Sequence, residues 1–189
     1  MKKVVSILLI GLLALTGCTV SDEWQESLYL NDGLYLDGNQ MSPPSYGALY
    51  EVSEAGTNID MPDADTFYRW VSTTAGLTAG KDYVIASADS DTLTIGVKGA
   101  GVYTVAVAYS FSGTVNTLFE GAVFVNGVRQ QNLEFNRFIG AGGDQGFAGI
   151  MGFVELNRGD VLDYRIMSDT MSATATTRHA TLVINRVGR

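Results

Sequence analysis

The chain of 189 residues carries 20 acidic and 12 basic side chains, and its formal net charge is −8. This balance excludes nucleic acid as the expected partner, because phosphate binding needs clustered lysine and arginine. The single cysteine, Cys18, excludes an intramolecular disulfide, a thiolate metal site and a redox pair. Packing alone must therefore hold the fold, and the length suits one ordinary domain with a sizeable core.

Residues 1–17 have the order of a secretory signal peptide. Lys2 and Lys3 give a positive start, and an apolar stretch at 4–15 follows, interrupted only by a serine and a glycine. A positive start, a short apolar stretch and small residues before a cleavage point are typical of secretion signals. The apolar stretch is also shorter than the roughly 20 residues that a membrane-spanning helix needs.

The four residues Leu-Thr-Gly-Cys at 15–18 resemble a bacterial lipobox. This resemblance implies that Cys18 receives a lipid on its thiol, becomes the new N-terminus and anchors the protein in a membrane. Thr19 follows the cysteine, with no aspartate there to favour retention at an inner membrane, so the cell surface or an outer membrane is the expected location. An ordinary secretion signal, or an apolar segment docked on a partner, is the alternative.

Residues 18–45 are expected to form a lipidated N-terminus, a tether and one small β-element. Two similar runs follow each other at 28–33 and 34–39, and each contains the turn-forming pair Asp-Gly. Short alternating runs closed by such turns predict a β-hairpin or two stacked strands. The pair Pro43-Pro44 then predicts a stiff spacer before the globular part, because proline fixes φ and restricts the preceding residue.

The region 46–189 has the alternating pattern of a domain built from β-strands alone. Runs rich in β-branched and aromatic residues recur with turn signals between them, and no window has the pattern of a capped amphipathic helix. The clearest hairpin signal is Asn126-Gly127 between two apolar runs. About ten short antiparallel strands are expected, which predicts a sandwich or a barrel. The main strand candidates are 92–97, 102–110, 122–125 with its hairpin partner from 128, 147–156, 161–167 and 181–185.

Four segments in this region resemble motifs of the complement globular-head (C1q-like) and tumour-necrosis-factor superfamily. Gly-Val-Tyr-Thr-Val-Ala-Val at 101–107 is similar to its Gly-x-Tyr-x-Phe-x-aromatic strand, with valine at two positions where aromatics are usual. Val-Phe-Val-Asn-Gly at 123–127 resembles its apolar strand before an Asn-Gly turn, and 154–161 resembles its Leu-x-x-Gly-Asp-x-Val turn. The last strand, at 180–187, closes the chain as it does in that family.

The resemblance implies a jelly-roll β-sandwich that assembles as a homotrimer through apolar side chains near a threefold axis. It also implies recognition of a glycan or a protein by exposed loops or by grooves between protomers. Bacterial and phage members are surface, spore or virion proteins. Two functions follow: a surface adhesin or receptor-binding lipoprotein, and a structural virion part such as a fibre head or capsid decoration whose N-terminal segment docks on a partner.

Catalysis is not expected. His179 is the only histidine, and it lies in a threonine-rich approach to the last strand, where a surface or interface role is the better interpretation. A glycan hydrolase would need two carboxylates flanking a groove, which the sequence does not locate.

Two spaced acidic pairs provide the only metal hypothesis. Asp63 with Asp65, and Asp89 with Asp91, could bind calcium, which prefers several oxygen ligands from a turn. Neither pair has the rest of a calcium-loop signature, so solvated turn carboxylates are the alternative interpretation, and no other cofactor is expected.

The glycine-rich run at 140–146 predicts a surface loop that could contact a ligand. A phosphate-binding loop would need a helix after it, whereas a strand pattern follows here. Exposed loops often carry binding function, so Gly142, Gly143, Asp144 and Gln145 are the candidate ligand-binding residues.

Four aromatic residues could form a platform on which a sugar ring stacks. In a β-domain, such a cluster is more often part of the core or of a subunit interface. These residues are Phe67, Tyr68, Trp70 and Tyr109.

Overall fold

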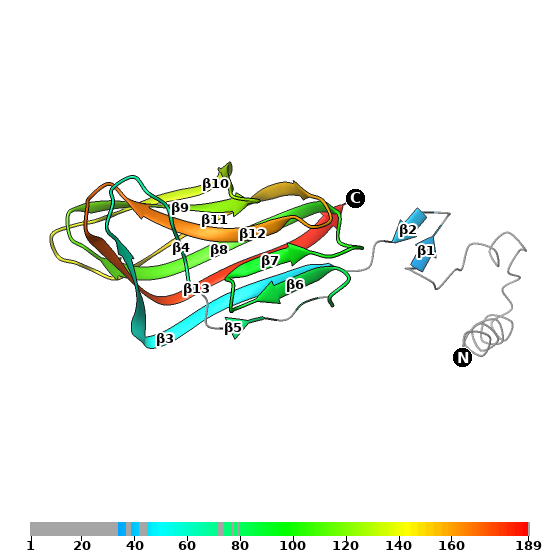
Figure 1. Cartoon of the computed structure of the whole chain (residues 1–189), viewed down its shortest axis with the longest axis horizontal. Coiled ribbons are helices and arrows are strands. Elements are labelled where there is room, and N and C mark those ends of the chain that lie inside the picture. Colours follow the sequence, from blue (N-terminus) through cyan, green and yellow to red (C-terminus); the bar gives the residue numbers. More distant parts are fainter. Residues whose placement is uncertain are drawn as a thin grey trace, which may run out of the picture. The chain divides into compact units, whose positions relative to one another are not determined.

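A computed structural model of the chain describes residues 34–36, 39–41, 45–71, 74–76, 78 and 80–188. The chain divides into two compact units, Met1–Pro43 and Pro44–Arg189, and the second is called the head below. The described residues contain strands but no helix, and therefore no helix long and apolar enough to cross a membrane. The expectation of a fold built from β-strands alone is confirmed (Figure 1).

In the first unit, β1 (Leu34–Leu36) pairs with β2 (Asn39–Met41) in an antiparallel hairpin. This hairpin lies within the range 18–45 for which the sequence pattern predicts a short β-element, and β2 follows β1 directly in the chain. The run at 28–30, which the repeat offered as a second arm, and the spacer at 42–44 lie outside the described residues.

The head contains two antiparallel sheets, with eleven strands in its described part. The first sheet, called the outer sheet, has the spatial order β10 (Val128–Ile139), β9 (Thr117–Val125), β12 (Val161–Ser168), β7 (Thr92–Ile95) and β6 (Val84–Ser87), with β4 (Tyr68–Arg69) beside β12. The second sheet, called the inner sheet, has the order β11 (Gly146–Leu156), β8 (Gly101–Gly113), β13 (Ala173–Gly188), β3 (Tyr46–Met61) and β5 (Thr74–Ala75).

The two sheets share one apolar core, which makes the head a sandwich. Along β8 the buried and half-buried side chains alternate without a break from Gly101 to Ser112, as expected for a strand with one face on the core. Buried aromatic side chains from both sheets meet in this core. Tyr109 of the inner sheet packs against Tyr164 of the outer sheet with ring centroids 5.5 Å apart. Tyr164 in turn stacks on Phe135 at 6.1 Å.

The two ends of the sandwich carry different loops. Ser45 and Gly188, the first and last described residues of the head, lie at one end, called the base, where Asn185 pairs with Tyr46. At the opposite end, called the tip, Ala173 pairs with Met61. The loops at the tip connect β3 to β4, β8 to β9, β10 to β11 and β12 to β13. The predicted ligand-binding loop is therefore at the end opposite to Ser45.

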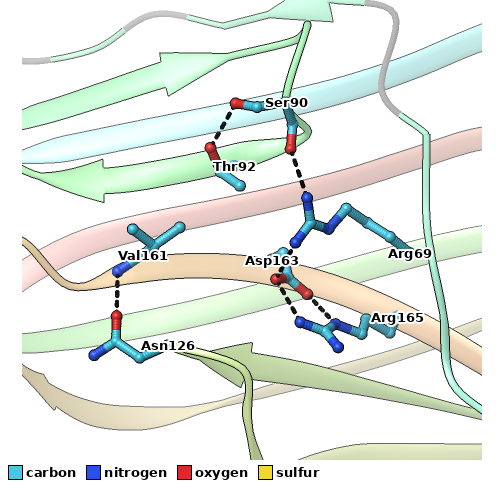
Figure 2. A network of polar contacts seen from close by, with 7 residues as sticks. All are labelled: Arg69, Ser90, Thr92, Asn126, Val161, Asp163 and Arg165. Atoms are coloured by element: carbon cyan, nitrogen blue, oxygen red, sulfur yellow. Dashed lines mark hydrogen bonds and ion pairs between the residues drawn. The ribbon is translucent and has the colours of Figure 1, made fainter.

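The hairpin and turn motifs predicted from sequence are both at the base, and they bond to each other. Asn126 and Gly127 form the turn between β9 and β10 with φ angles of 52° and 78°, values that asparagine and glycine tolerate better than other residues. The Asn126 amide nitrogen donates to Asp160 Oδ1 at 2.8 Å. Asn126 Oδ1 accepts from the Val161 backbone N–H at 3.0 Å, a bond drawn in Figure 2. Asp160 Oδ2 also accepts from the Asn157 backbone N–H at 2.7 Å.

We expect Asp160→Ala to destabilise the head by about 1–3 kcal/mol, because two donors lose a charged acceptor and the two turns lose their connection. Urea unfolding followed by fluorescence measures the change. Asp89→Ala is the control, because Asp89 is an exposed carboxylate in another turn. Equal midpoints for the two variants would contradict the role given to Asp160.

Candidate functional site

The outward face of the inner sheet has a block of four rows, across four neighbouring strands, that contains no charged residue. Cross-strand partners have their side chains on the same face of a sheet, so the registers of β11, β8, β13 and β3 define four rows of four residues. None of the residues in these rows is Lys, Arg, Asp or Glu. The rows are Phe153–Thr104–Asn185–Tyr46, Met151–Ala106–Val183–Ala48, Gly149–Ala108–Thr181–Tyr50 and Phe147–Ser110–His179–Val52, and together they are called the uncharged face.

Large apolar side chains are concentrated along one edge of the uncharged face. Phe147, Met151 and Phe153 on the edge strand β11 are 70%, 70% and 61% exposed. The next strand, β8, presents the small side chains of Ala106 and Ala108 in the same rows. The face therefore has a ridge at β11 and a flat floor beside it. Soluble proteins seldom leave such contiguous apolar surface open unless it contacts another molecule.

The free edge of β11 is capped by side chains of β10. The Asn132 amide donates to the Phe153 carbonyl oxygen at 2.9 Å. Arg137, whose guanidinium lies over the Phe111 ring, donates to the carbonyl oxygens of Phe111 and Gly146, the latter at 2.9 Å. These contacts close the sandwich between β10 and β11 and fix the edge strand that carries the ridge.

The predicted ligand-binding loop borders the uncharged face. The Gln145 amide donates to Ser110 Oγ at 3.2 Å, and Ser110 belongs to the row that begins with Phe147. Arg137 donates to the Asp144 carbonyl oxygen at 3.0 Å and lies 4.0 Å from the Asp144 carboxylate, and the Asp144 side chain is 78% exposed. Gly142 and Gly143 complete the turn, which the Gly143 N–H closes on the Gly140 carbonyl. The loop thus holds an accessible carboxylate beside the ridge, and its ligand-binding role stays a prediction.

The exposed face of the outer sheet is of a different kind, because its charges are paired with each other. Asp163 on β12, only 2% exposed, accepts from Arg165 Nε at 2.6 Å and from Arg69 Nη2 at 3.1 Å. Arg69 also donates to the Ser90 carbonyl oxygen at 3.1 Å, so it joins β4 to the turn between β6 and β7 (Figure 2). The hydrogen bonds to Asp163 raise the pKa of Arg165, since they stabilise the charged guanidinium.

Aromatic rings extend this network across the outer sheet. The Arg165 guanidinium lies 4.2 Å from the centroid of Phe124, and Phe124 packs edge-on against Phe67 at 5.2 Å. The Arg129 guanidinium lies 4.7 Å from the Phe67 centroid and forms a bidentate pair with Glu134. These stacked contacts fix the segment that contains Phe67 and Arg69 over the outer sheet. The surface is internally satisfied, which indicates a structural role.

The other candidate residues are separated by the fold. Trp70 and Tyr109 are buried core residues, so the proposed sugar platform is wrong for these two, while Phe67 and Tyr68 are half-buried. The alternative interpretation of the cluster, as core, is correct for Trp70 and Tyr109. Their aromatic side chains stabilise the contact between the sheets instead of meeting solvent.

The two acidic pairs lie in different turns. Asp63, which accepts from the Tyr68 hydroxyl at 3.0 Å, and Asp65 lie between β3 and β4. Asp89 and Asp91 lie between β6 and β7. Within the described residues, no three His, Cys, Asp or Glu side chains come together as potential metal ligands. Neither acidic pair therefore has a third such ligand among the described residues, and calcium binding stays a prediction.

His179 is exposed on β13, in the row that contains Ser110 and Val52. No acidic residue shares this row, so the register provides no orienting carboxylate for a nucleophile–histidine pair. Cys18 lies outside the described residues.

Comparison with known proteins identifies the fold. No protein-family model matches the sequence, and neither does any curated protein. Among solved structures, Eiger TNF from S. frugiperda superposes with a TM-score of 0.56 at 12% identity, over 77% of this chain and 94% of that one. Murine APRIL gives 0.53 at 14% identity, over 77% and 100% of the two chains. The globular domain of zebrafish complement 1qA protein gives 0.53 at 13% identity, over 78% and 99%.

The head is a TNF/C1q-like jelly roll. The fold expected from the four motifs is thus confirmed, and each motif has its expected place: the first is β8, the second is the turn between β9 and β10, the third joins β11 to β12, and the fourth is the end of β13. At these identities the likeness shows the fold alone, so function has to be argued from the surfaces of the TNF/C1q-like head.

Sequence analysis did not single out the ridge residues Phe147, Met151 and Phe153. A signal was present, because both alternating positions of 147–154 are apolar or glycine. In an antiparallel sheet that has one face exposed to solvent, each strand normally alternates apolar and polar residues. Apolar residues at both positions therefore indicate a second surface that becomes covered.

We expect Asp163→Asn to destabilise the protein by about 1–3 kcal/mol, because two guanidinium groups lose their shared charged acceptor. Thermal and urea unfolding measure the loss. Asp89→Asn removes the same charge from an exposed turn and is the matched control. A loss of the same size in both variants would show that net charge, and not the network in Figure 2, is responsible.

Proposed function

We propose that the protein is a non-enzymatic binding module, displayed at a cell surface, whose TNF/C1q-like head assembles as a homotrimer through the uncharged face. The observation that carries the proposal is the ridge of Phe147, Met151 and Phe153 beside a floor of small side chains on a head of this fold. Burial of such a ridge removes apolar surface from water and stabilises association.

The arrangement of ridge and floor favours a ring of copies. The ridge lies on the edge strand β11, whereas the floor of small side chains lies on the next strand, β8. A ridge that packs on the floor of a neighbouring copy makes a contact between two different surfaces, and repetition of such a contact closes a ring when the rotation permits. Three copies are the number that the resemblance implies.

The ligand is proposed to bind at the tip. The loop with Gly142, Gly143, Asp144 and Gln145 lies at the tip, opposite to Ser45, and it adjoins the uncharged face through Ser110. A trimer built on that face would place each loop beside a neighbouring copy. The proposed ligand is a glycan or a protein, held by these loops or by the grooves between protomers.

The lipid anchor at Cys18 completes the proposal. An anchor at Cys18 precedes Ser45, which lies at the base, so the tip is the end of the head that is free to meet a ligand. The alternative is a virion part, a fibre head or capsid decoration, whose N-terminal segment docks on a protein partner instead of carrying lipid.

We expect Met151→Glu to abolish the trimer, because three carboxylates would be buried without partners in the assembled face. Sedimentation equilibrium of the head, residues 44–189, measures the mass of the assembly. The expected mass is that of three copies for the unaltered head and of one copy for the variant, with an unchanged circular dichroism spectrum.

Phe138→Glu is the matched control for this experiment. Phe138 is 61% exposed on β10, in the outer sheet, so this variant should keep the mass of the unaltered head. A monomeric unaltered head, or a Met151→Glu variant that remains trimeric, would contradict assembly through the uncharged face.

We expect Cys18→Ala to move the protein from the membrane fraction to the soluble fraction, since the lipid attachment point is lost. Fractionation of cells and the mass of the mature N-terminal peptide measure this. An unaltered chain that carries no acyl group and is recovered with assembled virions would instead support the alternative.

A further inference from the structure

The only histidine of the chain, His179, is exposed on the outward face of β13. Its cross-strand neighbours are Ser110 of β8 and Val52 of β3, so it belongs to the row that begins with the ridge residue Phe147. Histidine is the side chain whose ordinary change of charge falls between about pH 5 and 8. The uncharged face therefore contains one group that acid can charge.

The positions around this imidazole on the outward face are occupied by groups that stay neutral. On β8 the flanking outward residues are Ala108 and Ser112. On β11 the residues in its row and in the next row towards the base are Phe147 and Gly149. On β3 the outward neighbour towards the base is Tyr50, and phenols ordinarily ionise only near about pH 10. None of these groups can balance a positive charge near neutral pH.

Charged side chains on the neighbouring elements lie at the border of the face or behind it. Arg178 precedes the histidine and lies beside the irregular part of β3, where a Cβ on Gly56 would be 3.9 Å from its Cγ. Glu51 is completely buried, so its carboxylate is on the core side of the sheet. Three further carboxylates are exposed: Glu54 in the irregular part of β3, Asp60 nearer the tip on β3, and Asp144 in the loop before β11. The register thus places no carboxylate in the row of the imidazole or in the two adjoining rows.

The proposed contact between copies is large enough to cover this imidazole. Strands lie about 4.8 Å apart and alternate residues about 6.8 Å apart, so four strands by four rows measure roughly 19 Å by 27 Å. This footprint of roughly 500 Å² is smaller than the about 800 Å² that each partner contributes to a typical stable interface. A contact of that size, centred on the uncharged face, extends over all four rows, including the row of His179.

We propose that His179 makes assembly of the head sensitive to acid, so that the homotrimer forms near pH 8 and dissociates when the imidazoles are protonated. The inference rests on the proposed assembly through the uncharged face. Burial of a charge without a partner is unfavourable, whereas a neutral imidazole can be satisfied by uncharged donors and acceptors.

The direction of the effect follows from where the proton binds. The separate head accepts a proton on the exposed imidazole, whereas the assembled face excludes it, so falling pH favours the separate copies. An imidazole of ordinary acidity is protonated about ten times more often than not at about pH 5.5. Complete exclusion of that proton lowers the association constant about tenfold for each copy, and therefore about a thousandfold for three copies.

Sedimentation equilibrium of the full chain at about pH 8 and about pH 5.5 tests the proposal, since carboxylates of ordinary acidity stay ionised at both. The expected result is an association constant about a thousandfold lower at the acid pH, with an unchanged circular dichroism spectrum. A trimer with equal association constants at both pH values would overturn the role of His179 and leave the proposed assembly intact. A single copy at both pH values would overturn the assembly itself, and this proposal with it.

Two variants separate the imidazole from other groups that respond to acid. His179→Gln cannot be charged, so its association constant should stay the same at both pH values. His179→Lys carries a charge throughout, so its association should be weak already at about pH 8. Arg178→Gln alters the preceding residue of the same strand and is the matched control, which should keep the acid response of the unaltered chain. Acid dissociation of the His179→Gln variant would contradict the proposal.

Discussion

The head depends on one contact between its sheets, the buried packing of Tyr109, Tyr164 and Phe135. The three rings come from β8, β12 and β10, with centroids 5.5–6.5 Å apart, so two strands of one sheet are fixed against the other sheet. Gly121 allows this packing, because a Cβ at that position would lie 2.0 Å from Tyr164 Oη and 2.7 Å from the Phe135 ring. Once the rings are in place, the strict alternation of each strand determines which residues face outward.

The two outward faces that result have opposite chemistry. On the outer sheet, Asp163 and Glu134 neutralise nearby arginines, and aromatic rings stack between the guanidinium groups. On the inner sheet, the four rows contain no formal charge, and Phe147, Met151 and Phe153 are largely exposed. Such asymmetry is expected when the charges of one face are paired within the chain and the other face is covered by a second molecule.

Local signals predicted much of the fold. Asn126-Gly127 requires a left-handed turn, the repeated alternation of 102–110 requires one buried face, and both are observed. The rows of the uncharged face could not be predicted, because they depend on pairing between segments far apart in the chain, such as Val183 with Ala106. The partner of β1 was not predicted for the opposite reason, since the near-repeat offered two equivalent arms and the alternation could not choose between them.

The same distinction applies to the candidate site. The loop at 142–145 was predicted correctly as a connection between strands, because glycine-rich runs rarely lie inside them. That it adjoins an exposed ridge follows from the Gln145 contact to Ser110, which connects positions 35 residues apart and leaves no local pattern. Trp70 and Phe67 are close in sequence, yet one is in the core and the other on the outer face of the outer sheet, because successive side chains of this extended segment point to opposite faces.

The hydrogen bonds from Asn132 and Arg137 to β11 affect how the protein behaves when many copies lie close together. An exposed edge strand is a template on which an identical strand can add, and repeated addition leads to fibrils. Carbonyl oxygens at Gly146 and Phe153 already accept from side chains of the same molecule, so an incoming strand would have to displace these donors. Crowded copies can therefore meet through side-chain packing, whereas addition of a strand along β11 would first have to break these two hydrogen bonds.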